Sequence, residues 1–209
     1  MACTLEFENG IFEKVWGSFT FELKENKNSK IKYSFTDPIK EKTDFVEKYL
    51  RDIVPDENER NMMLHRITRC LVSDGGCVGN DNILILNGDN GSNGKSVFVN
   101  FVMSVFGEYS TTTDITTNSN ARISFLTECY KVVKDAFRDT NIFFAMHNNY
   151  TPDLTQKHII NFPTRFCSNP QEPNERLVDP NISTHLNDCR NEFVHILLNI
   201  YPLKNLSKP

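Results

Sequence analysis

The sequence predicts an α/β fold, and three adjacent features near the middle of the chain support that prediction. Residues 83–86 form a short, continuous apolar run, which is typical of a strand buried on both faces of a parallel sheet. The run leads directly into GDNGSNGKS, residues 88–96. Beyond it, apolar residues recur with helical spacing up to Gly107, a residue type common just after a helix C-terminus. The expected order is therefore strand, glycine-rich loop and helix.

The elements expected along the chain divide it into three segments. The first segment is residues 1–40, in which residues 4–35 alternate apolar and polar positions and predict short strands or hairpins. Residues 41–80 change to helical spacing and predict two helices, the second led by Pro55 and the acidic residues that follow it. Residues 81–209 hold the strand and loop described above, and we expect them to close with one amphipathic helix over residues 182–201.

Length and composition fit one main domain with a short appendage. The chain has 209 residues, of which 39% are hydrophobic, so it can bury a substantial core. Its 23 basic and 27 acidic residues give a net charge of -4, which excludes an overall basic character for binding nucleic acid. Any contact with DNA must therefore be local. The six cysteines lack the spacing of a zinc site, which predicts free thiols in a reducing compartment.

The sequence shows no sign of a membrane or export segment. No apolar run is longer than about five residues, far shorter than the roughly 18 to 20 residues that a membrane-spanning helix needs. Glu6 and Glu8 stand where a secretory signal would need a basic start and an apolar stretch. We therefore expect an intracellular protein that is not secreted and has no membrane partner.

The residue types of the segment 88–96 fit a phosphate-binding loop. A loop that opens a helix directs backbone N–H groups and the positive end of the helix dipole at one spot. Gly91 and Gly94 would let the backbone approach a phosphate closely. Lys95 would reach the β and γ phosphates of ATP, and the Ser96 hydroxyl would bind Mg²⁺.

The spacing within this loop departs from the usual signature. Five residues separate Gly88 from Gly94, whereas the signature has four. Either the loop is one residue longer, or Asp89 occupies the first position. The alternative interpretation is a hairpin turn rich in Asn and Gly, but the flanking strand and amphipathic helix favour the nucleotide site.

Four blocks of sequence, taken in order, point to a known family. They are LEFENGIFE, FVEKYLRDIVPDENERNMMLHRITRCLV, SNGKS and the tail FPTRFCSNPQEPNERLVDPNISTHLNDCRNEFVHILLNIY. Together they resemble superfamily 3 helicases of the poxvirus-type primase-helicase group, found in large DNA viruses and some phages. Asn93 ahead of Gly-Lys-Ser is characteristic of that group. The resemblance covers most of the chain, and only residues 110–140 align poorly.

The resemblance implies an AAA+-like P-loop ATPase with a small β and helical lead-in. Members of the family hydrolyse ATP with Mg²⁺ and act as homo-oligomeric rings, usually hexamers, that move along single-stranded DNA during genome replication. Beyond the phosphate loop they carry a Walker B acid, a DNA-contacting loop, a sensor Asn and an arginine finger. This chain is shorter than the family between the phosphate loop and the sensor strand.

The best candidate for the Walker B acid is Glu128. It follows the apolar residues of the segment 123–126, which should form a strand parallel to the one before the phosphate loop. Such a carboxylate would hold the Mg²⁺ water shell and polarise the attacking water. Asp135 is the second candidate. Surface carboxylates on a helix explain either residue equally well.

The sensor segment fits the family better. Residues 142–145 predict a buried strand that should lie parallel to residues 83–86, as a neighbour or one strand away. Asn149 then fits the family's Asn-x-x-Pro, with Asn148 as a near-equal alternative. Either would face Lys95 across the nucleotide pocket and orient the lytic water. A simple turn explains the same residues, since Asn and the residue before Pro both favour turns.

The chain departs from the family at the arginine finger. Gln156, Lys157 and His158 stand where the family carries arginines. Lys157 would be a poor substitute, because an ammonium lacks the planar, bidentate fork of a guanidinium.

The family's DNA-contacting hairpin is also missing, because the spacing between Glu128 and Asn149 is too short for it. Lys131, Lys134 and Arg138 form a basic cluster near that place, which is more typical of a solvated helix face than of a DNA track.

Three functions therefore compete. The first is an ATP-dependent DNA helicase or ATPase of viral DNA replication, either active or a degenerate or partial copy. The second is a non-catalytic, nucleotide-binding accessory or relic protein. The third is a small P-loop kinase, which the length suits but for which no arginine-rich lid is present. ATP turnover with and without single-stranded DNA would separate them.

Overall fold

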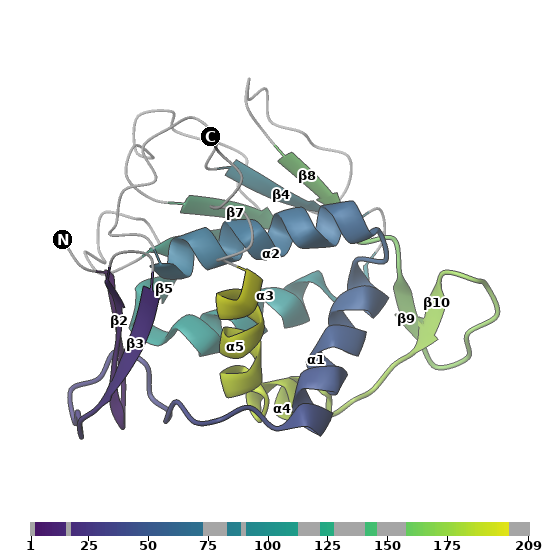
Figure 1. The fold of residues 1–209 in the computed structure, drawn as a ribbon. Coiled ribbons are helices and arrows are strands. Elements are labelled where there is room, and N and C mark those ends of the chain that lie inside the picture. Colours follow the sequence, from purple (N-terminus) through teal and green to yellow (C-terminus); the bar gives the residue numbers. More distant parts are fainter. Residues whose placement is uncertain are drawn as a thin grey trace.

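The computed structural model describes residues 3–15, 18–72, 83–88, 91–112, 122–127, 141–145 and 158–200, which form a mixed α/β fold (Figure 1). Within these residues, the largest sheet has five parallel strands in the order β5-β6-β7-β4-β8. The strands are β4 (Ile83–Asn87), β5 (Ser110–Thr111), β6 (Ile123–Thr127), β7 (Asn141–Ala145) and β8 (His158–Asn161).

Two smaller sheets flank this one in sequence. The first is antiparallel and consists of β1 (Cys3–Phe7), β2 (Gly10–Val15) and β3 (Ser18–Leu23), as the alternating pattern predicted. The second is a parallel pair of β9 (Arg165–Cys167) and β10 (Glu175–Leu177), which the sequence did not indicate. Each strand of that pair has only three residues, too few for a periodic signal.

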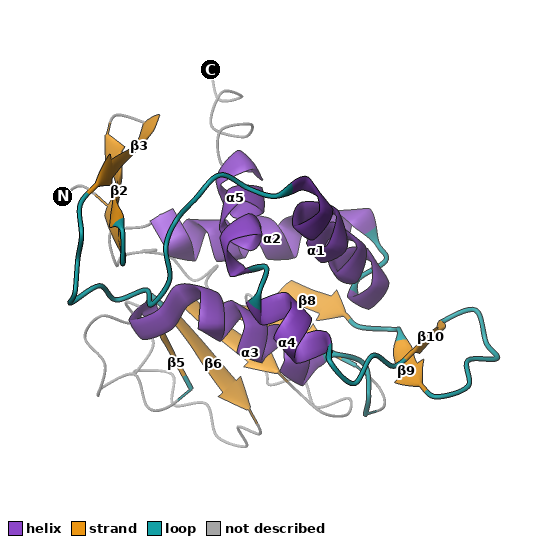
Figure 2. Ribbon diagram, turned by 90° about the horizontal axis from the view of Figure 1, so that it is seen from below, coloured by secondary structure: helices purple, strands orange, loops and turns teal. Residues whose placement is uncertain are grey.

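The helices form two layers on one side of the large sheet. They are α1 (Lys40–Ile53), α2 (Glu57–Val72), α3 (Lys95–Phe106), α4 (Ile182–Asn187) and α5 (Arg190–Ile200), with a 3-10 turn, η1 (Gly107–Tyr109), after α3. Figure 2 shows α3 between the sheet and the layer of α1, α2 and α5. No helix in the described residues is long and apolar enough to cross a lipid bilayer.

Local signals explain where these helices begin and end. The predicted pair of helices before the large sheet is confirmed, and α2 begins at Glu57 because the Asp56 carboxylate accepts the N–H of Glu59 at 2.8 Å. The predicted helix after the loop ends at Phe106, and Gly107 follows at a φ of 54°. A Cβ at Gly107 would lie 2.4 Å from the Lys30 carbonyl oxygen, so this turn requires glycine.

The predicted arrangement of the central strands is confirmed. β4 and β7 are parallel neighbours, with Leu84 opposite Phe143. β6 is the third parallel strand and pairs with β7 on its other side. β8, which was not predicted, pairs with β4 on the side away from β7.

The prediction of one continuous closing helix is wrong. A turn at Asp188 and Cys189 separates α4 from α5, and the N–H of Cys189 donates to the Leu186 carbonyl at 2.9 Å. Both α4 and α5 contact α3, and the turn lets α5 contact α1 and α2 in addition. Leu186, Cys189 and Phe193 are all buried, so the apolar stripe continues across the turn and periodicity alone does not reveal it.

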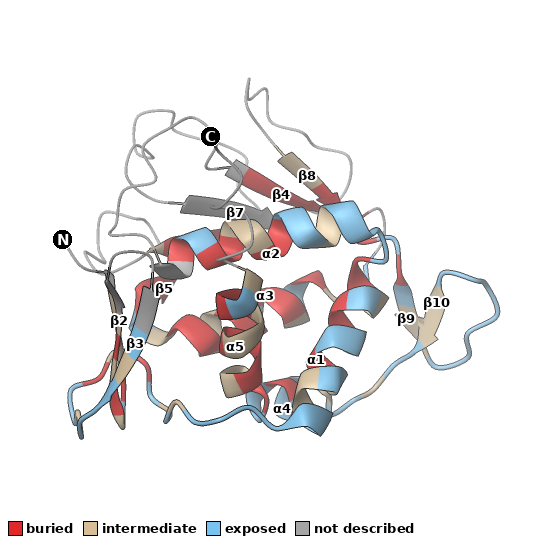
Figure 3. Cartoon of the chain, viewed as in Figure 1, coloured by how far each residue is buried: buried red, intermediate tan, exposed pale blue. Residues whose placement is uncertain are grey.

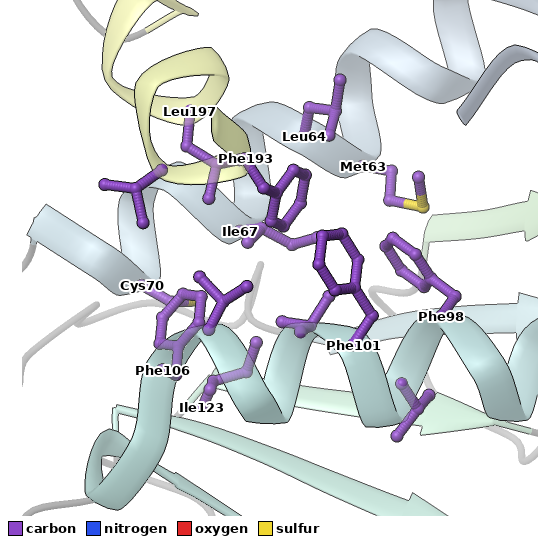
Figure 4. Packing of buried hydrophobic residues seen from close by; sticks show 14 of the residues in the cluster. Met63, Leu64, Ile67, Cys70, Phe98, Phe101, Phe106, Ile123, Phe193 and Leu197 are labelled. Carbon is purple, nitrogen blue, oxygen red and sulfur yellow. The ribbon is translucent and has the colours of Figure 1, made fainter. Parts of the chain in front are cut away.

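The hydrophobic core lies where α3 meets the outer helix layer. Figure 4 shows side chains of α3 in contact with those of α2 and α5, and the rings of Phe101 and Phe193 have centroids 4.9 Å apart. In Figure 3, α3 is buried over most of its length, whereas α1 has one buried and one exposed face. The packing of α3 fixes the position of the loop that precedes it.

Candidate functional site

The strand order places a ligand-binding position at the carboxyl end of β4. From β4 the chain crosses through α3 to β5 at one edge, and returns through β6 and β7 to the flank of β4. It then forms β8 on the opposite flank. Connections that leave neighbouring strands in opposite directions open a crevice at the carboxyl ends, where α/β sheets bind ligands. The loop 88–96 lies at this point.

The loop turns sharply into α3. Ser92 and Gly94 adopt φ values of 66° and 83°, in the left-handed region. Gly94 is the N-cap of α3, and its carbonyl accepts the N–H of Phe98 at 2.9 Å. The Ser92 carbonyl accepts the N–H of Phe166 at 2.8 Å, so β9 fixes the loop from outside. The first turn of α3 therefore faces the crevice with its backbone N–H groups.

Lys95 is buried at the base of the loop, although lysine side chains are seldom buried in proteins. The residue is only 3% exposed. Its ammonium donates hydrogen bonds to the Gly88 carbonyl at 3.2 Å and to Asn93 Oδ1 at 2.9 Å. A buried ammonium is costly unless hydrogen bonds satisfy it. The loop therefore holds a positive charge next to a helix N-terminus, which is an arrangement that suits a phosphate.

Gly88 is needed for this contact. A Cβ at position 88 would lie 1.9 Å from Asn93 Nδ2 and 2.5 Å from Lys95 Nζ, so any side chain would displace the ammonium or its partner. Gly91 differs, because a Cβ there would meet no atom of the described residues within 4 Å. Ser96 is exposed on the first turn of α3, beside the loop.

A cavity of about 340 Å³ adjoins the loop. Its walls come from α1, the loop, the start of α3, β9, the end of β10 with the segment after it, and the start of α4. They include Phe45, Tyr49, Val97, Phe166, Val178 and Ile182. The volume falls in the range of small-molecule sites, which are mostly apolar with a few polar groups.

The polar groups that line this cavity include the Tyr49 hydroxyl and the Asp52 carboxylate. The Tyr49 hydroxyl is buried and has no hydrogen-bond partner among the described residues. Burial raises the pKa of Tyr49 above its ordinary value, so the hydroxyl keeps its proton. The Asp52 carboxylate lies 2.5 Å from the Lys48 ammonium and 3.7 Å from Arg176 Nε.

Several predicted site residues lie outside the described residues. These are Asp89, Glu128, Asn149 and the alternatives Asp135 and Asn148, together with Lys131, Lys134, Arg138, Gln156 and Lys157. Their flanking strands are described. β6 ends at Thr127, directly before Glu128, and β7 ends at Ala145. The two strands are parallel neighbours of each other, and β7 also pairs with β4, so all three end at the same edge of the sheet. His158 begins β8 and is opposite Leu84, away from the loop.

Sequence reasoning missed two groups of residues near the loop. The first comprises the cavity residues Tyr49 and Phe166, which lie in two of the blocks that resemble the family but were given no role there. The second comprises Asn87 and Asn161, which end β4 and β8 and share a hydrogen bond of 3.1 Å. An Asn that ends an apolar strand next to a loop was the available signal.

Comparisons with known proteins support the fold. No family model and no curated protein sequence matches the chain. Among solved structures, three apo structures of the NrS-1 C-terminal region match with TM-scores of 0.54, 0.52 and 0.51. This chain shares its fold with the NrS-1 C-terminal region.

The likeness extends over nearly all of this chain but over only part of the NrS-1 C-terminal region. Sequence identities are 14%, 11% and 9%, over 92%, 96% and 96% of this chain. The chain spans 52% of the first NrS-1 structure and 66% of the other two, about half to two thirds of their length. The fold is therefore that of part of the NrS-1 C-terminal region.

Proposed function

We propose that this chain is a nucleotide-binding protein of viral DNA replication, the P-loop ATPase portion of a superfamily 3-type helicase. The observation that carries the proposal is the buried Lys95 ammonium in a glycine-containing loop that opens α3 at the carboxyl end of β4. The fold of the NrS-1 C-terminal region, from a viral primase-helicase, supports the same role.

The phosphates of ATP would lie in front of the loop. The Lys95 ammonium would exchange its contacts with the Gly88 carbonyl and Asn93 Oδ1 for phosphate oxygens, with the N–H groups of the first turn of α3 as further donors. Ser96, which is exposed on the first turn of α3, would supply its hydroxyl to Mg²⁺. When bound, Mg²⁺ neutralises charge on the β and γ oxygens.

The base and ribose would fill the adjoining cavity. Phe45, Tyr49 and Phe166 provide apolar and aromatic surface, and the Tyr49 hydroxyl offers an unused donor close by. The cavity touches the loop at Ser92 and Gly94, so one ligand can occupy both the loop and the cavity.

For hydrolysis, we propose Glu128 as the Walker B acid and Asn149 as the sensor. The parallel order of β6, β7 and β4 supports this assignment, since all three strands end at the edge of the sheet where the loop begins. Arginine is missing at positions 156–158, and an arginine finger is typically worth about 10³ to 10⁵ in turnover. We therefore expect little or no helicase activity from this chain alone, and binding without turnover is the second candidate function.

The family's remaining properties are part of the same proposal. They are assembly into a homo-oligomeric ring, contact with single-stranded DNA, and action inside the host cell, in the cytoplasm or at the viral replication site. The test of the proposal starts from nucleotide binding.

The experiment is calorimetric titration of the purified chain with ATP and Mg²⁺, followed by ATP turnover with and without single-stranded DNA. Lys95→Ala should abolish binding, because it removes the ammonium at the base of the loop. Lys27→Ala is the matched control, since Lys27 is an exposed lysine paired only loosely with Glu25 at 3.9 Å. Equal affinity in the wild type and Lys95→Ala would refute the proposal. Robust strand displacement by the pure protein would refute the expectation of weak helicase activity.

A further inference from the structure

A chain of hydrogen bonds ties the first turn of α2 to the carboxyl ends of β8 and β4. Glu59 Oε2 accepts the backbone N–H of Asn161 at 2.6 Å, and Glu59 Oε1 accepts Asn161 Nδ2 at 2.8 Å. Asn161 Oδ1 in turn accepts Asn87 Nδ2 at 3.1 Å. In Figure 1 the arrowheads of β4 and β8 point toward the end of α2 that joins α1. Three elements therefore meet at this edge of the sheet.

This chain of bonds ends one peptide bond away from the loop. Asn87 directly precedes Gly88, whose carbonyl accepts the Lys95 ammonium at 3.2 Å. The Asn87 carbonyl also accepts the N–H of Phe162 at 2.7 Å, so the last residue of β4 is held through both its side chain and its backbone. Any shift of Asn87 would carry the Gly88 carbonyl with it.

The chemistry at position 59 requires a carboxylate. Both Glu59 oxygens accept hydrogen bonds from a single residue, Asn161, one from its backbone and one from its side-chain amide. A carboxylate only accepts, so it orients the amide of Asn161 with its nitrogen toward Glu59 and its oxygen toward Asn87. A glutamine at this position would present an NH₂ group to one of the two donors and break part of the chain of bonds.

We infer that Glu59 is a positioning residue of the nucleotide site, although among the described residues its side chain hydrogen-bonds only to Asn161 and does not line the cavity. Through Asn161 and Asn87 it holds the Gly88 carbonyl, and hence the Lys95 ammonium, in the geometry that receives a phosphate. The inference rests on the proposed nucleotide binding and adds α2 to the parts of the chain that determine it. The competing explanation is that Glu59 only fastens α2 to the sheet.

The two explanations differ in how they affect nucleotides with different phosphate lengths. A positioning role acts on the part of the affinity that depends on the β-phosphate, because the loop contacts that phosphate. A fastening role lowers stability and affects all nucleotides alike. ADP and AMP share base, ribose and α-phosphate, so the ratio of their dissociation constants isolates the contribution of the loop.

The experiment compares Glu59→Gln with Glu57→Gln. Glu57 is exposed on the same first turn of α2, so its variant removes the same charge near the same helix N-terminus. Calorimetry would give the Kd of ADP with Mg²⁺, and competition would give that of AMP. We expect Glu59→Gln to raise the Kd of ADP about five- to tenfold, which is within the range expected for the loss of one ordinary hydrogen bond, and that of AMP by less than about twofold. Glu57→Gln should leave both unchanged.

Asn87→Ala gives a second test that leaves the bonds between Glu59 and Asn161 in place. It should weaken ADP binding to a similar extent, and the double variant should bind no worse than either single variant, because the contacts act in series. The inference is overturned if Glu59→Gln binds ADP like Glu57→Gln, or if it weakens ADP and AMP equally. A wild type that binds no ADP would overturn the proposed function and this inference with it.

Discussion

Substitution of Gly88 by alanine tests the geometry of the loop without any ligand. A Cβ at position 88 would lie 1.9 Å from Asn93 Nδ2 and 2.5 Å from Lys95 Nζ, distances that folded proteins do not tolerate. The neighbours are ends of side chains, so the loop would respond by moving Asn93 or Lys95. Either movement breaks a hydrogen bond of the buried ammonium.

The magnitude follows from the bonds that are broken. Loss of one hydrogen bond to a charged group costs about 1.5 to 3 kcal/mol. Alanine also restricts the unfolded chain, which stabilises the folded state by about 0.4 to 1 kcal/mol. Gly91→Ala provides the matched control, because its Cβ would meet no described atom within 4 Å and neither glycine has a positive φ. The unfolded-state effect then cancels between the two variants.

The assay is thermal unfolding of the chain without nucleotide. For a protein of this size, a difference of about 1.5 to 3 kcal/mol corresponds to about 3 to 12 °C in Tm. We expect Gly88→Ala to melt lower than Gly91→Ala by that amount. If the two variants melt together, the close contact between Gly88 and the Lys95 ammonium is not a feature of the folded protein, and the description of the site is wrong.

Two further predictions concern the core and the β9–β10 segment. Phe101 is 2% exposed and packs on Phe193, so Phe101→Ala should lower the free energy of unfolding by about 3 to 5 kcal/mol, measured by urea titration. The control Leu23→Ala, at a position that is 77% exposed, should have little effect. Equal effects of the two variants would contradict the packing shown in Figure 4. The N–H groups of Gln171 and Glu172, with a smaller contribution from Arg165, hold the pKa of Glu175 below its ordinary value of 4.5. Because the folded pKa is lowered, the stabilisation by Glu175 is present above pH 4.5 and is lost as the pH falls through the folded pKa. NMR titration of the Glu175 carboxyl should show this, and a midpoint at or above 4.5 would contradict it.

Local sequence determined the elements that carry the loop. An apolar run, closely spaced glycines and a helical stripe ending at Gly107 are signals read over a few residues each, and the structure places β4, the loop and α3 there. The same holds for α1 and α2, whose boundary is marked by Pro55 and the Asp56 cap. The parallel order of β4, β6 and β7 was also predicted, because the candidate site residues after each strand had to meet at one edge.

Only the tertiary structure decided the features that join distant segments. The turn between α4 and α5 lets α5 reach α1 and α2 in addition to α3, which both helices contact, although their apolar stripe is continuous. The cavity beside the loop takes its walls from α1, β9 and α4, and the Glu59 chain of bonds joins residues about a hundred positions apart. Periodicity describes which face of one element is apolar, but it carries no information on which distant element covers that face. That choice depends on packing and hydrogen bonding across the whole core, which the chain reaches only once it is folded.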